Sequence, residues 1–211
     1  PYLTYLAPFS FQAKRDGSLS EPALGNLPAI AEDHGAVFMM VITNLENLQF
    51  STELGQILLN DETVQNNLFN NIEKMANKYS VSDIHFDFER LRGEDRNAYT
   101  AFLRKAKERF SSQGITISIA LAPKTSASQQ GIYYEAHDYR AQGAVVDFVV
   151  IMSYEWGYSG GPAQAVSPIG PVRNVLQYAI SEIPSRKVMM GQNLYGYDWT
   201  LPFRPGTTAK A

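Results

Sequence analysis

The chain has 211 residues, of which 45% are hydrophobic and 18% charged, and its formal net charge is −3. Acidic and basic residues are interspersed, so no basic stripe is available to neutralise phosphates, and no apolar run reaches the roughly 18 residues of a membrane span; we therefore expect neither a nucleic-acid nor a membrane partner. The chain has no cysteine, which excludes disulfides and cysteine chemistry.

The chain alternates strand-like and helix-like stretches from its beginning. Aromatic and β-branched residues over 2–11, and apolar runs further on, are typical of strands, whereas stripes at helical spacing are typical of helices. The first half predicts, in order, a strand over 2–11, a short helix over 24–34, a buried strand over 36–43, a loop over 44–50, a short helix from about 51 and a long helix from about 61.

The second half continues the alternation. It predicts strands over 83–89, 115–122, 145–153 and 187–194. Between them it predicts helices over 93–112, 135–142 (short) and 171–181. Strands that alternate with helices form parallel sheets through crossover connections. No repeat and no linker is visible, so we expect a single α/β domain over 1–211.

The stretch Asp83–Glu89 (DIHFDFE) has ionisable residues at its odd positions and apolar residues at its even positions. Taken alone, this period of two is typical of an antiparallel strand with one face in water. The flanking helices favour a parallel strand instead, and such strands are covered on both faces. The ionisable row must then face a shared enclosed space, and clustered buried charges mark functional sites. We interpret this strand as the catalytic one.

Further polar and aromatic residues stand where other predicted strands end. Tyr154 and Glu155 follow one strand, and Tyr195 and Asp198 follow the last. Enzymes with a (β/α)₈ barrel carry their active sites on that face. Six predicted strands are two short of such a barrel.

The ordered motifs resemble glycoside hydrolase family 18, the chitinase-like family. The D-x-D-x-E strand of that family is matched by His85-Phe86-Asp87-Phe88-Glu89, and its M-x-Y-D end of a later strand by Met152-Ser153-Tyr154-Glu155. The runs YLAPFSF, IMSYEWGYSGGPAQAVSPIGPV and MMGQNLYGYDWTLPF resemble the spore-cortex branch, the SleL/YaaH-like N-acetylglucosaminidases. The resemblance implies a (β/α)₈ TIM barrel, here a fragment that lacks the first and last strands and is incomplete at both ends.

The resemblance also implies a mechanism. Family 18 uses substrate assistance in place of a second carboxylate as nucleophile. Glu89 would protonate the leaving oxygen and then activate water, while the acetamido carbonyl of the substrate attacks and the configuration is retained. Asp87 would accept a hydrogen bond from the acetamido N–H, and Tyr154 would donate to the acetamido oxygen. Repulsion between Asp87 and Glu89 should raise the pKa of the acid.

Substrate contacts are implied for a second set of residues, namely His85, Met152, Glu155, Trp156, Gln192 and Tyr195. His85 stands where the family has its first Asp, so it is either part of the catalytic row or a core histidine with satisfied hydrogen bonds. The aromatic residues are either sugar platforms or local packing.

The expected function is a retaining glycosidase that cleaves β-linked N-acetylglucosamine bonds in peptidoglycan of the spore cortex, without a cofactor. The alternative is a catalytically inactive carbohydrate-binding relative. A metal site at Asp83, His85, Asp87 and Glu89 is disfavoured because alternation spreads them over roughly 20 Å. We expect an exported protein of the spore coat, cortex or cell wall that binds an N-acetylglucosamine-containing glycan (peptidoglycan or a chitin oligomer). It should be monomeric when complete, whereas the 211-residue piece alone should aggregate through its open sheet edges.

Overall fold

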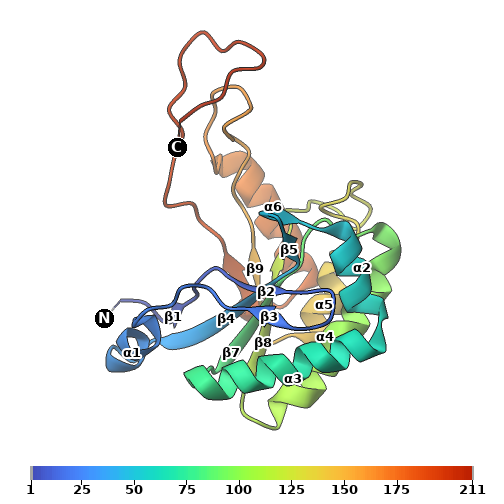
Figure 1. Cartoon of the computed structure of the whole chain (residues 1–211). Helices are drawn as coiled ribbons and strands as arrows, with labels where there is room; N and C mark the ends of the chain where they lie inside the picture. Colours follow the sequence, from blue (N-terminus) through green and yellow to red (C-terminus); the bar gives the residue numbers. More distant parts are fainter. Residues whose placement is uncertain (1, 211) are drawn as a thin grey trace.

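The computed structural model of the protein describes residues 2–210 and is organised around one twisted sheet (Figure 1). The sheet order is β10-β9-β8-β7-β4-β2-β3, and β1 also pairs with β4. All pairings are parallel except β2 with β3. The strands are β1 (Tyr5–Leu6), β2 (Phe11–Ala13), β3 (Leu19–Ser20), β4 (Val37–Thr43), β7 (Asp83–Asp87), β8 (Thr116–Leu121), β9 (Phe148–Ile151) and β10 (Val188–Met190).

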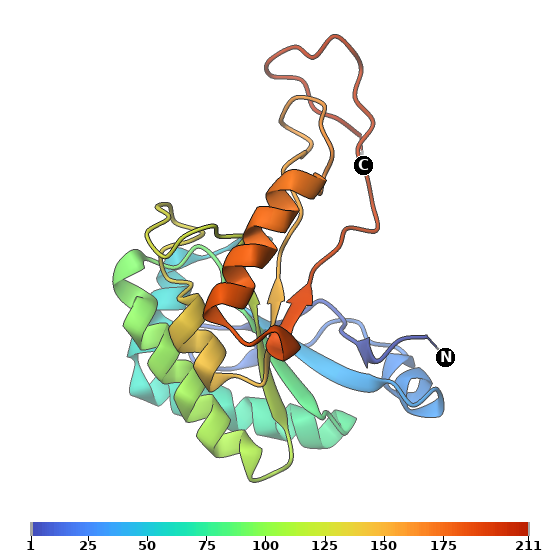
Figure 2. The same ribbon diagram turned by 180° about the vertical axis from the view of Figure 1, so that it is seen from behind.

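Helices follow the strands and cover one face of the sheet, as Figures 1 and 2 show. They are α1 (Leu27–Asp33), α2 (Thr52–Asn60), α3 (Glu62–Tyr79), α4 (Arg96–Ser111), α5 (Tyr139–Val145) and α6 (Ile169–Glu182), with 3₁₀ turns η1 (Gly93–Asp95) and η2 (Ser185–Lys187). Within residues 2–210, no helix is both long and apolar enough to cross a membrane. The predicted α/β class with parallel strands is confirmed.

Helix α3 shows how the sequence directs these elements. The Asp61 carboxylate accepts hydrogen bonds from the backbone N–H groups of Thr63 and Val64, at 2.9 and 3.1 Å, and so caps the helix. The helix ends at Tyr79, and the C-cap residue Ser80 adopts a left-handed φ of 52°. Its buried stripe packs into the core, as the helical spacing predicts.

Several boundaries differ from the sequence-based expectation; the strands expected over 145–153 and 187–194, for example, are shorter in the structure, as β9 (Phe148–Ile151) and β10 (Val188–Met190). The strand expected over 2–11 is divided into β1 and β2, and Pro8, which has no N–H to donate, lies in the break. The loop expected over 44–50 is a hairpin of β5 (Leu45–Glu46) and β6 (Gln49–Phe50), with positive φ at both turn residues, Asn47 and Leu48. That turn type usually carries glycine, which is absent here. The helix expected over 135–142 begins at Tyr139, because Asp138 is its N-cap.

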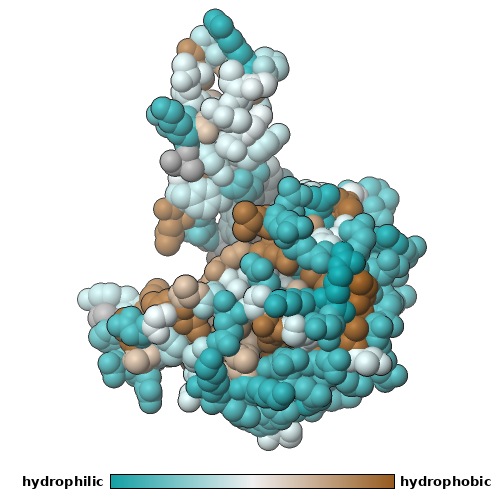
Figure 3. Space-filling view, viewed as in Figure 1, coloured by the Kyte–Doolittle hydropathy of each residue, from teal (hydrophilic) through white to brown (hydrophobic). Residues whose placement is uncertain are grey.

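The sheet does not close into a barrel. Its edges are β10 on one side and the β1, β2 and β3 strands on the other. The segment after β10 projects away from the sheet beside the β9–α6 loop (Figures 1 and 2), where Ala209 donates to the Ser159 carbonyl at 2.8 Å. Figure 3 shows hydrophobic residues in the recess between this projection and the N-terminal arm. Met189 and Met190 on the edge strand are 39% and 48% exposed.

Candidate active site

Strand β7 presents two different faces. Phe86 packs on Phe102 of α4 with ring centroids 5.0 Å apart, and Phe88 stacks on Tyr99 at 5.8 Å. The even positions therefore face the helices, and the odd positions face the opposite, inner side of the sheet. Asp83, His85 and Asp87 are all buried on that side, and Glu89 lies just beyond the end of the strand.

The backbone around Glu89 is held by two buried side chains, Asn44 directly after β4 and His137 in the segment between β8 and α5. The Asn44 amide accepts from the Glu89 N–H at 3.0 Å and donates to the Glu89 carbonyl at 2.9 Å. On the other side, His137 Nε2 lies 3.0 Å from the Phe88 carbonyl, and its Nδ1 accepts from the Ala122 N–H at 2.9 Å. Because Nδ1 accepts, the ring proton is on Nε2, which donates to Phe88. Glu89 is thus fixed between the ends of β4 and β8.

A cleft of about 860 Å³ opens above this point, between the β8–α5 loop and helix α6. Five residues expected at the site from sequence line it, namely Glu89, Met152, Tyr154, Glu155 and Trp156. Residues that the sequence did not single out complete its walls, among them Gln129, Tyr133, Tyr134 and Asn174. The size suits a substrate of several rings.

The pKa values of both acids at this site, Asp87 and Glu89, are raised. Burial raises the pKa of Asp87, and the neighbouring Glu89 carboxylate raises it further. Burial also raises the pKa of Glu89. Both shifts favour the protonated form of the pair, and a general acid must be protonated before it can donate. One oxygen of Asp87, Oδ1, is buried without a hydrogen-bond partner.

Tyr154 follows the end of β9 and lines the cleft together with Glu89. Burial, followed by the charges of Asp87 and Glu89, raises its pKa to about 12, so the phenol remains a hydrogen-bond donor. Its ring packs against Gly191 after β10, where a Cβ would come within 2.9 Å of Tyr154 and 2.6 Å of the Ile151 carbonyl. Only glycine fits at this position.

Glu155 adopts a left-handed φ of 68°, a conformation that residues other than glycine seldom take outside functional or turn positions. Its carboxylate accepts hydrogen bonds from the hydroxyls of Tyr195 and Tyr197, the second at 3.0 Å. Tyr195 therefore reaches the cleft through Glu155 and does not line it. Gln192 is exposed and also lies outside the cleft lining.

His85 lies below Asp87 and is 7% exposed. Burial lowers the pKa of its imidazole to about 4, so the ring is neutral at pH 7. Its Nδ1 is 2.8 Å from the Ser118 hydroxyl of β8. The ring is therefore a hydrogen-bonded neighbour of the acids and does not line the cleft.

The sequence held one overlooked signal for this site. Asn44 is a polar residue that directly follows the apolar run of β4. Its position after a strand is similar to that of Tyr154, which comes shortly after β9. His137 gave no such signal, because it lies in an irregular segment whose path is set by tertiary contacts. The described residues contain no group of three or more His, Cys, Asp or Glu arranged to hold a metal ion.

Comparison with known proteins agrees with this geometry. Residues 23–209 match the family model described as Glycosyl hydrolases family 18. The chain is 64% identical over 208 residues to the cortical fragment-lytic enzyme of Bacillus subtilis (strain 168). The matched region covers 99% of this chain and 48% of that protein. It matches the crystal structure of the Bacillus cereus spore cortex-lytic enzyme SleL with a TM-score of 0.96 at 56% identity, covering 100% of this chain and 49% of that one.

A chitinase from Chromobacterium violaceum, 22% identical, has the same fold with a TM-score of 0.88, covering 97% of this chain and 64% of that one. The chain spans about half the length of the curated relatives it matches. The architecture is that of the family's TIM barrel, here with the barrel open. The predicted resemblance is confirmed: the chain belongs to glycosyl hydrolase family 18.

Proposed function

We propose that the protein containing this chain is a retaining glycosidase that cleaves β-linked N-acetylglucosamine bonds in spore-cortex peptidoglycan by substrate-assisted catalysis. The observation that carries the proposal is the arrangement at the end of β7. Glu89 lines the cleft with a raised pKa, and Asp87 lies beneath it with a free oxygen. The similarity to cortex-lytic enzymes supports cortex fragments as substrate and the spore cortex as location.

Each residue has one role in the proposed reaction. Glu89 donates its proton to the glycosidic oxygen as the bond to the leaving sugar breaks, and later takes a proton from the incoming water. The acetamido oxygen of the substrate attacks the anomeric carbon, and Asp87 accepts the acetamido N–H and opposes its growing positive charge. Tyr154 donates its hydroxyl to the acetamido oxygen and aligns it.

The walls of the cleft support a glycan as ligand. Trp156, Tyr133 and Tyr134 provide aromatic faces, and Glu155 and Gln129 provide polar groups for sugar hydroxyls. Met152 adds apolar surface to the lining. In this proposal Tyr195 supports the substrate indirectly, by holding Glu155.

The test is Glu89→Gln in the complete natural protein, assayed by release of reducing ends from purified cortex fragments. The amide keeps the shape of the side chain but supplies no acid, so the rate should fall by about 10²–10⁴ while glycan binding persists. Glu94→Gln, at a position in η1 outside the cleft, is the matched control and should retain full activity. Near-wild-type turnover by Glu89→Gln would overturn the assignment. A wild-type protein that binds cortex fragments but never cleaves them would favour the carbohydrate-binding alternative.

A further inference from the structure

One wall of the cleft is an irregular segment, residues 122–138 between β8 and α5, here called the β8–α5 wall. It contributes five polar or aromatic side chains to the lining, namely Thr125, Ser126, Gln129, Tyr133 and Tyr134. Residues 122–138 form no helix or strand, so no regular ladder of backbone hydrogen bonds joins the two halves of the segment. Side chains must therefore hold these halves together.

Lys124 is buried inside this wall and is only 1% exposed. An ammonium has three N–H donors, and three backbone carbonyls accept them. Lys124 Nζ lies 2.9 Å from the His137 carbonyl, 3.0 Å from that of Tyr134 and 3.5 Å from that of Ala127. Ala127 belongs to the first half of the wall, and Tyr134 and His137 belong to the second. Because a buried cation is costly without partners, the ammonium and the two halves hold one another in place.

The backbone of Lys124 is itself anchored. Its N–H donates to the hydroxyl of Tyr139 at 3.0 Å, and this hydroxyl donates to the Ala122 carbonyl at 2.6 Å. Tyr139 is buried at the start of α5. The ammonium therefore projects from a fixed point and joins the two halves of the wall.

The bonds of Lys124 are separate from those that hold the proposed acid. Lys124 binds the backbone carbonyl of His137, whereas the His137 ring makes the bonds to the Phe88 carbonyl and the Ala122 N–H. Lys124 is not among the residues that line the cleft. Loss of its ammonium would therefore release the wall and leave the bonds around Glu89 in place.

We propose that Lys124 is a positioning residue that holds the β8–α5 wall in the shape that binds the glycan. It acts through the backbone that carries Gln129, Tyr133 and Tyr134, and it sets the affinity for the glycan without taking part in the proton transfers of Glu89. The inference rests on the proposed function for the identity of the ligand, whereas the shape of the wall is a property of the folded chain.

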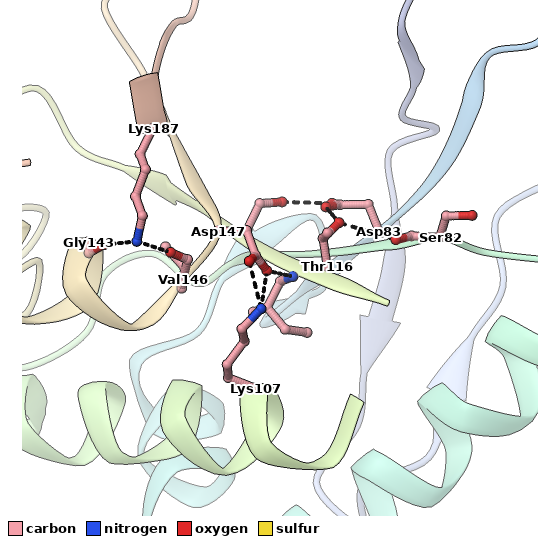
Figure 4. A network of polar contacts seen from close by, with 10 residues as sticks. Ser82, Asp83, Lys107, Thr116, Gly143, Val146, Asp147 and Lys187 are labelled. Carbon is pink, nitrogen blue, oxygen red and sulfur yellow. Dashed lines mark hydrogen bonds and ion pairs between the residues drawn. The ribbon is translucent and has the colours of Figure 1, made fainter. Parts of the chain in front are cut away.

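The test is Lys124→Met in the complete natural protein, which removes the ammonium and keeps an unbranched side chain of similar length. KM for purified cortex fragments should rise about tenfold, with kcat within about threefold of wild type, as for loss of binding made equally in ground and transition states. Lys187→Met is the matched control. Figure 4 shows Lys187 donating to two backbone carbonyls, those of Gly143 and Val146, at 3.0 and 2.7 Å, and it lies outside the cleft lining. An unchanged KM in Lys124→Met, or an equal rise in Lys187→Met, would overturn the inference.

Binding measured without turnover separates this inference from the proposed function. In a Glu89→Gln background, calorimetric titration with cortex fragments should give a Kd about tenfold higher when Lys124→Met is added, and an unchanged Kd when Lys187→Met is added. A wild-type protein that never cleaves the fragments would overturn the proposed function, and the two Kd values would still decide the role of Lys124.

Hydrogen exchange in the wild-type protein decides the case if Lys124→Met does not fold. The Tyr134 N–H donates to the Gly131 carbonyl at 2.8 Å within the wall, and the Thr207 N–H donates to the Arg204 carbonyl at 3.0 Å in an exposed turn. A wall fixed by Lys124 requires the Tyr134 amide to exchange at least tenfold more slowly than the Thr207 amide. Equal exchange rates would show that the wall is not held, and would overturn the inference.

Discussion

Asn44 holds the backbone of Glu89 with a pair of hydrogen bonds like those between neighbouring strands. Its buried amide pairs with both the N–H and the carbonyl of Glu89, and also donates to the Ser51 carbonyl at 2.9 Å. These three bonds fix the backbone from which the proposed acid projects. A general acid must lie within hydrogen-bond reach of the leaving oxygen, so small displacements are costly.

Asn44→Asp should therefore reduce kcat by about 10- to 100-fold with little change in KM. The aspartate can accept from the Glu89 N–H, but it cannot donate to the Glu89 and Ser51 carbonyls and repels both. Asn71→Asp is the matched control, because Asn71 also donates to two carbonyls, those of Gly17 and Asn67, but lies outside the cleft. Steady-state kinetics of both variants would decide, and an equal loss in the two would contradict the positioning role.

His137 should make stability depend on pH in the acid range. Burial lowers its pKa from 6.5 to about 4, so the unfolded chain binds the proton first. The stabilisation is present above the unfolded pKa and is lost as the pH falls from about 6.5 toward 4. His137→Gln should thus gain stability relative to wild type, on the order of 2 kcal/mol, between pH 7 and 4.5. Urea unfolding at the two pH values measures this, with exposed His34→Gln as control. A pH-independent difference would contradict it.

At the scale of elements, the ends of β9 and β10 depend on one another. The Gly191 N–H donates to the Ile151 carbonyl at 2.8 Å, and the Ser153 hydroxyl donates to the Gly191 carbonyl at 2.7 Å. The two strand ends are thus joined directly below Tyr154. Close backbone approach, and the absence of a side chain at Gly191, set the position of the Tyr154 ring.

Gly191→Ala should displace the Tyr154 ring, since the new Cβ would lie 2.9 Å from it and 2.6 Å from the Ile151 carbonyl. We expect a loss of about 1–3 kcal/mol of stability from overpacking, and a fall in kcat of about tenfold or more. Gly196→Ala is the control, because a Cβ there has no neighbour within 4 Å. Thermal unfolding and kinetics of the pair measure both effects. Normal activity in Gly191→Ala would show that the ring position does not depend on this glycine.

Periodicity predicted most of these elements, because strand and helix spacing are local properties. It found β7 and the two faces of that strand, since alternation alone separates Asp83–Glu89 into polar and apolar rows. It missed the β5–β6 hairpin, whose turn residues Asn47 and Leu48 lack the usual glycine. It also missed the contacts of Asn44 and His137 with the Glu89 segment, because residues 45 and 49 positions apart meet only after the sheet has formed.

At the scale of the whole molecule, the chain forms an open sheet whose helices cover one face. The inner face carries the acids of β7 and faces the recess that Figure 3 shows. Exposed apolar residues on the edge strand and in the arm, such as Met190 and Phe9, are suited to contact further elements. The residues of this chain that line the cleft all lie between 89 and 175.

The central claim is that the substrate's own acetamido group attacks the anomeric carbon first, and that water does not attack it directly. The measurement that tests it most directly is ¹H NMR of the first product released by the complete natural protein from a β-linked cortex fragment. Substrate assistance involves two inversions, so the account predicts that the new reducing end appears first as the β anomer and mutarotates later. An initial α anomer would show direct attack by water and would contradict the mechanism assigned to Asp87, Glu89 and Tyr154.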